Sequence, residues 1–166
     1  MLGMPSSGKS TLGKQLAKLL HYEFIDLDQK IEATAGKKIA EIFQVDGEDA
    51  FRKIEADQLR KIPADSQLII ATGGGTPCFH DGMEYIKQTG LSVFLDVKPH
   101  KLAERVKSSK RGSRPLLDVE EVDVAQRLED TYNSRIDTYR QADITIEGDT
   151  DAETILWIIE AEFARK

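Results

Sequence analysis

The most chemically informative stretch is residues 3–11, Gly-Met-Pro-Ser-Ser-Gly-Lys-Ser-Thr, which matches the phosphate-loop pattern G-x-x-x-x-G-K-[ST] at every position. Its glycines let backbone N–H groups point inward around an anion, and the positive end of the following helix points to the same place. We expect Lys9 to reach the β- and γ-phosphates of a nucleoside triphosphate and the Ser10 hydroxyl to bind Mg²⁺. A plain Gly/Ser turn is the weaker alternative, because leucines recur at helical spacing directly after the loop. The predicted nucleotide-binding residues of the loop are Pro5, Ser6, Ser7, Gly8, Lys9, Ser10 and Thr11.

Two carboxylates, Asp26 and Asp28, follow a short apolar run and are separated by a single leucine. Such neighbours repel each other unless a cation lies close, and beside a phosphate loop Mg²⁺ and a substrate hydroxyl are the expected partners. We therefore expect Asp28 to orient a hydroxyl or accept its proton, and Asp26 to hold the metal through water. Asp28 could instead, or in addition, cap the helix that follows.

Two arginines are candidates for binding a substrate carboxylate, which a guanidinium contacts with two parallel hydrogen bonds. Arg52 lies one helical turn before Glu55, which would hold it in place. On spacing alone, a solvated ion pair of little energy is the favoured interpretation of these two residues. Arg135 lies near Tyr132 and Tyr139 on a later helix, and a surface arginine stacked on tyrosine explains that spacing equally well.

Three consecutive glycines, Gly73, Gly74 and Gly75, follow the apolar run at residues 68–71. Without a side chain, such residues let the backbone approach a ligand closely and offer uncovered N–H groups. Their place at the end of a predicted strand favours a binding site over a flexible loop.

A cluster of cations, Lys107, Lys110, Arg111 and Arg114, lies in one polar stretch before Pro-Leu-Leu. A charge run is usually a solvated face. Because this one interrupts an otherwise acidic chain with a phosphate loop, we interpret residues 107–120 as a closing lid. Its cations would reach the transferring phosphoryl group, and Lys107 and Arg114 are the predicted nucleotide contacts.

Strands and helices alternate along the chain, which predicts an α/β fold: three layers, α/β/α, around a central, mainly parallel five-stranded sheet. Ligands bind at the carboxyl ends of such strands, where the phosphate loop, the aspartates and the glycines fall. Strands are predicted at 22–26, 67–71, 91–96 and 143–146, and helices at 9–20, 27–35, 39–43, 47–60, 82–88, 99–107, 119–139 and 151–164.

The first strand is predicted to be truncated, because only Met1 and Leu2 precede the phosphate loop. A typical strand has about five or six residues. Three or four absent apolar side chains, at roughly 1.5–3 kcal/mol each, are a large loss for one domain. We therefore expect the natural start to lie upstream, or the stability to be poor.

The length of 166 residues predicts one domain, residues 1–166. The net charge of -6 disfavours a general nucleic-acid-binding protein. The sequence has one cysteine, which excludes an internal disulfide, and no apolar run approaches the length of a membrane span. We expect a cytoplasmic protein with no nucleic-acid or membrane partner.

Taken together, these motifs resemble the shikimate kinases, in the nucleoside monophosphate kinase-like group of P-loop proteins. The phosphate loop alone is shared with many kinases, but the combination is specific and spans nearly the whole chain in the family's order. The other matching pieces are 24–28, 39–43 with 46–48, 51–55, 73–75, 114–117, and Arg135 with Tyr139.

The resemblance implies ATP- and Mg²⁺-dependent phosphorylation of the 3-hydroxyl of shikimate, on the route to chorismate and aromatic amino acids, by a monomer. It implies a substrate-binding segment at about 27–60 and gives Asp28 the hydroxyl of the substrate. It also implies an adenine loop at 147–150, by position only, and places Lys107 near a nucleotide-contacting arginine of the family. Arg52 and Arg135 form the implied carboxylate clamp, and Glu55 supports Arg52. The backbone of Gly73, Gly74 and Gly75 approaches the ring of the substrate. Arg114 is the implied lid arginine, and Ser10 and Asp26 hold the metal.

Two other functions stay open. A gluconate-type kinase also joins a phosphate loop to a small polyol acid, although the Phe-Arg-x-x-Glu and Arg-Pro-Leu-Leu motifs argue against it. A catalytically weak, regulatory nucleotide-binding module would not need the complete set Lys9, Ser10, Asp26, Asp28 and Arg114.

Overall fold

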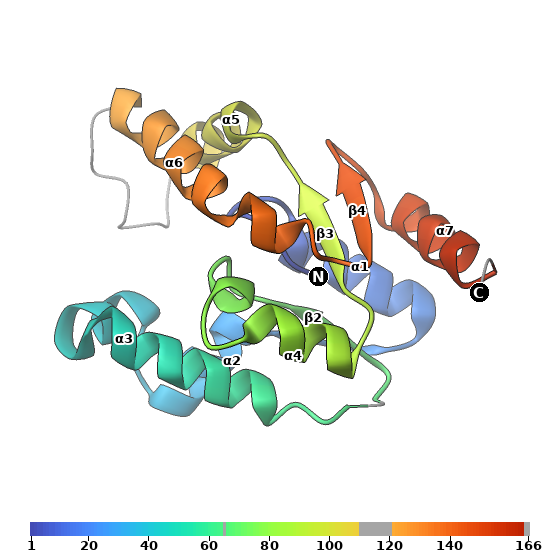
Figure 1. Cartoon of the computed structure of the whole chain (residues 1–166), viewed down its shortest axis with the longest axis horizontal. Helices are drawn as coiled ribbons and strands as arrows, with labels where there is room; N and C mark the ends of the chain where they lie inside the picture. Colours follow the sequence, from blue (N-terminus) through green and yellow to red (C-terminus); the bar gives the residue numbers. More distant parts are fainter. Residues whose placement is uncertain (65, 110–120, 165–166) are drawn as a thin grey trace.

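The computed structural model describes residues 1–64, 66–109 and 121–164, which alternate helices with four short strands (Figure 1). The strands are β1 (Glu23–Asp26), β2 (Leu68–Ala71), β3 (Val93–Asp96) and β4 (Ile144–Glu147). The helices are α1 (Lys9–Leu20), α2 (Leu27–Ala35), α3 (Ile39–Arg60), α4 (Gly82–Thr89), α5 (Pro99–Ser109), α6 (Glu121–Tyr139) and α7 (Ala152–Phe163), with a short 3₁₀ helix η1 (Thr76–Cys78).

The strands form two parallel pairs, β1 with β2 and β3 with β4. Met1 and Leu2 lie between the pairs: Leu2 bridges to Phe94, and the Thr72 N–H donates to the Met1 carbonyl at 3.1 Å. The predicted parallel α/β arrangement is confirmed. Within the described residues, a bridge at Leu2 stands in place of a fifth strand between the two pairs.

Helices cover both faces of β3, because its side chains alternate in direction. Phe94 packs in a cluster with residues of α4, α5 and α6, whereas Val93 and Leu95 pack in another with residues of α1 and α7. All four residues of β3 are buried. This two-sided burial explains why residues 93–95 of the strand are all apolar.

Local sequence signals set the ends of several helices. Gly36 ends α2 in the left-handed conformation, with φ 65°, as the sequence predicted. The predicted helices at 39–43 and 47–60 are one element, α3, with a kink at Gly47, where φ is 83° and ψ is 170°. The residues between the two predicted helices therefore continue the helical path, and the glycine changes its direction.

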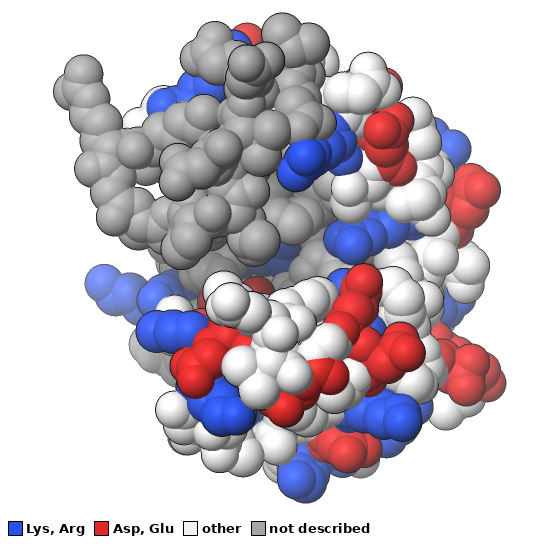
Figure 2. All heavy atoms as spheres, turned by 90° about the vertical axis from the view of Figure 1, so that its left-hand side faces the viewer, with Lys and Arg blue, Asp and Glu red and all other residues white. Residues whose placement is uncertain are grey.

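The described surface mixes charges of both signs. Figure 2 shows acidic and basic side chains interspersed over the white lower part of the face at the left of Figure 1. Among the described residues, no helix is both long and apolar enough to cross a membrane.

Candidate functional site

The phosphate loop wraps around the first turn of α1. Gly8 precedes the helix in a left-handed conformation with φ 102°, and Ser6 also has a positive φ of 65°. Positive φ values in the loop turn successive N–H groups toward its concave side. The Ser7 hydroxyl is buried and has no hydrogen-bond partner among the described residues. The loop therefore has the backbone form of an anion site, with a buried hydroxyl available to a ligand.

Lys9 is folded over this loop instead of extending into solvent. It is buried, and its Nζ donates to the carbonyl oxygens of Gly3 at 3.0 Å and Met4 at 2.8 Å. These bonds hold the ammonium group at the concave side of the loop, where a bound phosphate would meet it.

Asp26 connects the loop to β1. The Ser10 hydroxyl donates to Asp26 Oδ2 at 2.6 Å, and Asp26 Oδ1 accepts the Gln29 N–H at 3.2 Å as the cap of α2. The cap of this helix is therefore Asp26, and the prediction that Asp28 caps it is wrong, because α2 already begins at Leu27. A hydroxyl and a carboxylate oxygen in contact are hard ligands of the kind that Mg²⁺ prefers.

Asp28 lies in the first turn of α2, close to other charged groups. Burial, and after it the charges of Asp26 and Glu55, raise the pKa of its carboxyl to about 6, against the opposing charge of Lys9. A Cβ atom on Gly73 would be 2.8 Å from Asp28 Oδ1, so the first glycine of the triplet lies directly against this carboxylate. The Asp28 carboxyl is therefore a group that can take up a proton near neutral pH.

Arg52 and Glu55 form a buried pair inside the molecule. Arg52 Nη1 donates to Glu55 Oε2 at 2.9 Å, and Glu55 Oε1 accepts the Thr76 hydroxyl at 2.6 Å. Arg52 also donates to the exposed Glu48, and its guanidinium lies 4.3 Å from the centre of the Phe79 ring. The interpretation that spacing alone favoured, a solvated pair, is wrong: the side chains are 9% and 3% exposed.

The glycine triplet brings the separate parts of the site together. A Cβ on Gly74 would lie 2.9 Å from Pro5 of the phosphate loop and 3.2 Å from Arg135 Nη1 of α6. A Cβ on Gly75 would collide with the Arg52 guanidinium. Glycine is therefore required at all three positions, because charged or rigid side chains pack directly on this backbone.

Arg135 is half-buried beside the glycines, at the C-terminal part of α6. The neighbouring Tyr139 is fully buried, and its hydroxyl donates to the Gly74 carbonyl at 2.5 Å. Burial raises the pKa of Tyr139 to about 12, while the nearby Arg135 guanidinium lowers it. Arg135 thus belongs to the same cluster as Gly74, and Tyr139 fixes the backbone between them.

Sequence reasoning missed Arg105, which the structure places beside the phosphate loop. Its Nη1 donates to the Ser6 carbonyl at 3.0 Å, and it pairs with Asp149. A cleft of about 340 Å³ opens there, lined by Ser6, Ser7, Gly8, Thr11, Leu12, Leu95, Arg105, Gly148 and Thr150. Two of the lining residues, Gly148 and Thr150, belong to the predicted adenine loop. The sequence signal that could have identified Arg105 is its position two turns into a helix that follows the end of a strand.

The predicted lid is described only at its beginning. Lys107 is exposed on the last turn of α5, which continues to Ser109, so the first residues of the lid are helical. Arg114, Lys110 and Arg111 lie outside the described residues.

The chain was compared with known proteins. The family model described as shikimate kinase matches residues 5–162. A shikimate kinase from Clostridium botulinum (strain Loch Maree / Type A3) is 38% identical over 161 residues, covering 97% of this chain and 93% of the relative. The structure of shikimate kinase from Acinetobacter baumannii in complex with shikimate has a TM-score of 0.86 at 36% identity, covering 96% of this chain and 90% of that one.

A gluconokinase from Sinorhizobium meliloti shares the fold alone, with 17% identity and a TM-score of 0.51 over 99% of this chain and 89% of the other. The family-model match, by contrast, covers the phosphate loop from Pro5 onward, the Asp pair, the buried Arg52–Glu55 pair and the glycine triplet. With sequence relatives and solved structures in agreement across nearly the full length, the chain belongs to the shikimate kinase family.

Proposed function

We propose that this protein transfers the γ-phosphate of ATP to the 3-hydroxyl of shikimate, giving shikimate 3-phosphate and ADP. The observation that carries the proposal is the buried Arg52, held by Glu55 and packed against Gly75, in one cluster with Arg135 and Asp28. A buried arginine that is held by a carboxylate at 2.9 Å and lies against an aromatic ring suits the binding of a substrate carboxylate.

The nucleotide would bind in the phosphate loop, where Lys9 and the N–H groups of residues 5–11 neutralise its phosphates. Ser10 and Asp26 would hold Mg²⁺, Asp26 through water, since their oxygens lie side by side and are hard ligands of the kind that this ion prefers. When bound, the ion neutralises charge on the β- and γ-phosphates. Arg105 and the adenine loop at 147–150 line the cleft on the far side of the loop.

The acceptor would lie between α2, α3 and the glycine triplet. Asp28 orients the 3-hydroxyl and takes its proton, and Arg52 and Arg135 clamp the carboxylate. The N–H groups of Gly73, Gly74 and Gly75 approach the ring hydroxyls. This arrangement supplies position and charge, which is most of what phosphoryl transfer requires from a protein.

The proposal includes the lid, in which Arg114 and Lys107 would close on the phosphates after both substrates bind.

We also propose a single domain, residues 1–166, with the substrate segment at about 27–60 and the lid at about 107–120. A five-stranded sheet is supported by the bridge from Leu2 to Phe94 between the two strand pairs. A monomeric, cytoplasmic enzyme is the expected form.

The clamp is tested by Arg52→Ala, with Arg60→Ala as the matched control, because Arg60 lies on the same helix but contacts Tyr85 and the His80 carbonyl. Loss of charge-assisted hydrogen bonds worth about 1.5–3 kcal/mol should raise the KM for shikimate by about tenfold or more. The Kd for ATP should stay near that of the parent. For Arg135→Ala we likewise expect a raised KM for shikimate and an unchanged Kd for ATP. An equal loss of nucleotide binding in both variants would argue against the clamp.

A further inference from the structure

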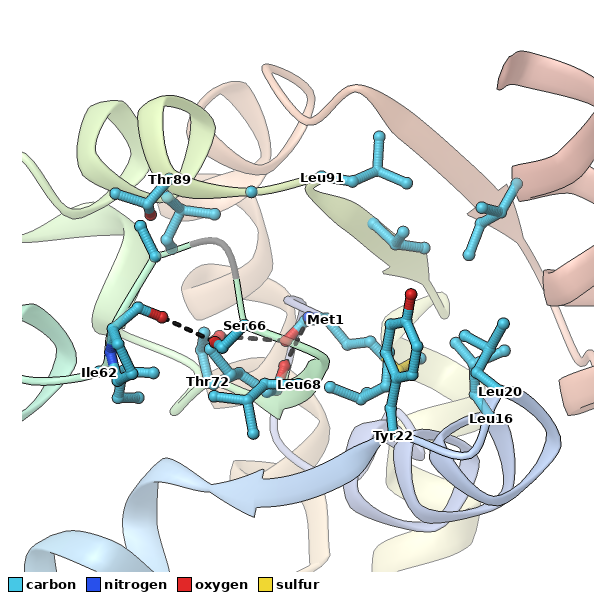
Figure 3. Close-up of a pocket in the computed structure, with 18 of the residues that line it drawn as sticks. Met1, Leu16, Leu20, Tyr22, Ile62, Ser66, Leu68, Thr72, Thr89 and Leu91 are labelled. Carbon is cyan, nitrogen blue, oxygen red and sulfur yellow. Dashed lines mark hydrogen bonds between the residues drawn. The ribbon is translucent and has the colours of Figure 1, made fainter. Parts of the chain in front are cut away.

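Exposed aromatic side chains occur in two different settings in this molecule. Tyr22, which is 37% exposed, lies beside Leu16 and Leu20 at the wall of an apolar cavity of about 480 Å³ (Figure 3), so its ring has apolar neighbours. Phe79 is exposed to the same degree, at 38%, but its ring lies over the buried guanidinium of Arg52. An aromatic face over a cation is an electrostatic contact, and this contact belongs to the candidate site.

Three aromatic rings lie near Arg52 in the described part of the chain, and that of Phe79 is the closest. The carbon Cζ of Arg52 is 4.3 Å from the centre of the Phe79 ring, against 5.1 Å for Phe51 and 5.8 Å for Phe43. Phe51 and Phe43 belong to α3, the helix that carries Arg52 itself. Phe79 follows η1, so its ring ties the guanidinium to a second element of the fold.

The chain around η1 contacts the buried ion pair at three points. The backbone of Gly75 lies so close to the Arg52 guanidinium that a Cβ atom would collide with it. The Thr76 hydroxyl donates to Glu55 Oε1 at 2.6 Å, and the Phe79 ring lies over the guanidinium. One short stretch of chain therefore holds the arginine, its carboxylate partner and the face of the guanidinium.

The backbone directly after Phe79 has an unusual conformation. His80 and Asp81 have φ values of 50° and 57°, in the left-handed region that residues other than glycine rarely adopt. The Gly82 N–H donates to the Phe79 carbonyl at 3.0 Å and closes this turn. Two consecutive left-handed residues destabilise a chain unless their surroundings hold them there, and such strain is typical of segments that place a side chain at a functional site.

We propose that Phe79 is a positioning residue for the acceptor: its ring holds the face of the Arg52 guanidinium and keeps water from it. The inference rests on the proposed function, in which Arg52 binds the carboxylate of shikimate. A guanidinium donates its hydrogen bonds in its own plane, so a ring on its face does not compete with a carboxylate. Removing water from that face strengthens the hydrogen bonds that the charged group makes in its plane.

Substitutions of Phe79 separate the aromatic face from simple apolar cover. Phe79→Ala should raise the KM for shikimate about threefold to tenfold, the range of a partly desolvated cation–π contact. The kcat and the Kd for ATP should stay within about twofold of the parent, because ground-state binding of the acceptor is what changes. Phe79→Leu, which keeps apolar bulk without an aromatic face, should raise this KM nearly as much, and Phe79→Tyr should restore it.

The matched control is Trp157→Ala, which removes an aromatic ring that is 68% exposed on α7 and should leave the KM for shikimate unchanged. A parent-like KM in Phe79→Ala, or in Phe79→Leu, would overturn the proposal.

A double-mutant cycle tests whether the ring acts through Arg52. In the Arg52→Ala background, Phe79→Ala should cause no further loss of kcat/KM for shikimate, since no guanidinium is left to hold. A loss equal to that measured with Arg52 present would show that Phe79 acts on another group, and would also overturn the proposal.

The Arg52 Nε–H signal in a nitrogen–proton correlation spectrum gives a readout that needs no kinase activity. The signal is assigned by its absence in Arg52→Ala. An aromatic ring over the guanidinium shifts its protons upfield, so Phe79→Ala should lose this shift and Phe79→Tyr should keep it. An unchanged signal in Phe79→Ala would overturn the proposal. A parent protein that does not phosphorylate shikimate would refute the proposed function, whereas this signal would still decide whether the ring holds the arginine.

Discussion

Among the residues of the site, Asp28 has the environment that most directly predicts a pH dependence of catalysis. Burial and the charges of Asp26 and Glu55 together raise its pKa to about 6, with Lys9 acting in the opposite direction. As the proposed proton acceptor it must be ionised, so kcat/KM for shikimate should fall as the pH drops below about 6. Asp28→Asn should bind ATP normally and turn over about 10²–10⁴-fold more slowly, with the exposed Asp137→Asn as a control. Near-normal turnover of Asp28→Asn would remove this residue from the reaction.

The same carboxyl group predicts a stability effect whose sign is fixed. Because its folded-state pKa lies above the ordinary 3.8, the folded protein binds this proton more tightly than the unfolded chain. Its contribution to stability is therefore full below about pH 4 and is lost as the pH rises through about 6. Thermal melts should show Asp28→Asn more stable than the parent at pH 7.5, with no such advantage at pH 4. An advantage at both pH values would show that the charge is not the cause.

Tyr139 is predicted to position the glycine triplet through a single hydroxyl. Tyr139→Phe removes the bond to the Gly74 carbonyl, which at about 1 kcal/mol should raise the KM for shikimate about fivefold. Tyr132→Phe is the matched control on the same helix, since its hydroxyl bonds Asp96 and Lys98 instead. Both variants should lose some stability in a thermal melt. Equal KM values in the two variants would show that the Tyr139 hydroxyl is only structural.

At the residue scale, types and spacing predicted the members of the site but not their burial. The same i,i+3 spacing describes an exposed ion pair and the buried Arg52–Glu55 pair, and what distinguishes them is packing against Phe79 and Gly75 from elsewhere in the chain. Arg105 was missed for a similar reason, because its partners Ser6 and Asp149 are 99 and 44 residues away.

At the element scale, α3 carries Arg52 and is kinked before it at Gly47, which makes the kink possible. Its φ of 83° with ψ of 170° is a conformation that essentially only glycine adopts. Gly47→Ala should lower stability by about 1–3 kcal/mol, or several degrees in Tm, although no atom would contact the added Cβ. Gly90→Ala is the control, because Gly90 also has open space but an extended φ of -179°. Equal Tm values for the two variants would contradict the assignment of strain to Gly47.

The boundaries of the elements were predicted best where a local signal exists. Helix α1 matches its predicted range of residues 9–20, and Gly36 ends α2 as expected. The two helices predicted at 39–43 and 47–60 meet in α3 at Gly47, whose φ and ψ are not helical, so the predicted interruption lies close to the kink. The 3₁₀ turn η1 was not predicted; its first residue, Thr76, bonds through its hydroxyl to Glu55, which is distant in the sequence.

At the scale of the whole molecule, the alternation of strands and helices correctly predicted a parallel α/β fold. The residues of the candidate site lie at the carboxyl ends of its strands. The pairing of the strands could not be predicted from local sequence, because β1 pairs with β2 although α2 and α3 lie between them in the chain. The sheet instead depends on long-range backbone bonds, of which Met1 and Leu2 supply those between the two pairs.

The central claim is that the cluster around Arg52 selects shikimate as the acceptor. The most direct measurement is ADP release from Mg-ATP with shikimate, quinate and gluconate as alternative acceptors, using protein shown by circular dichroism to be folded. The account predicts strong turnover with shikimate and little with the other two. Turnover that is strongest with gluconate, or absent with all three in folded protein, would contradict it.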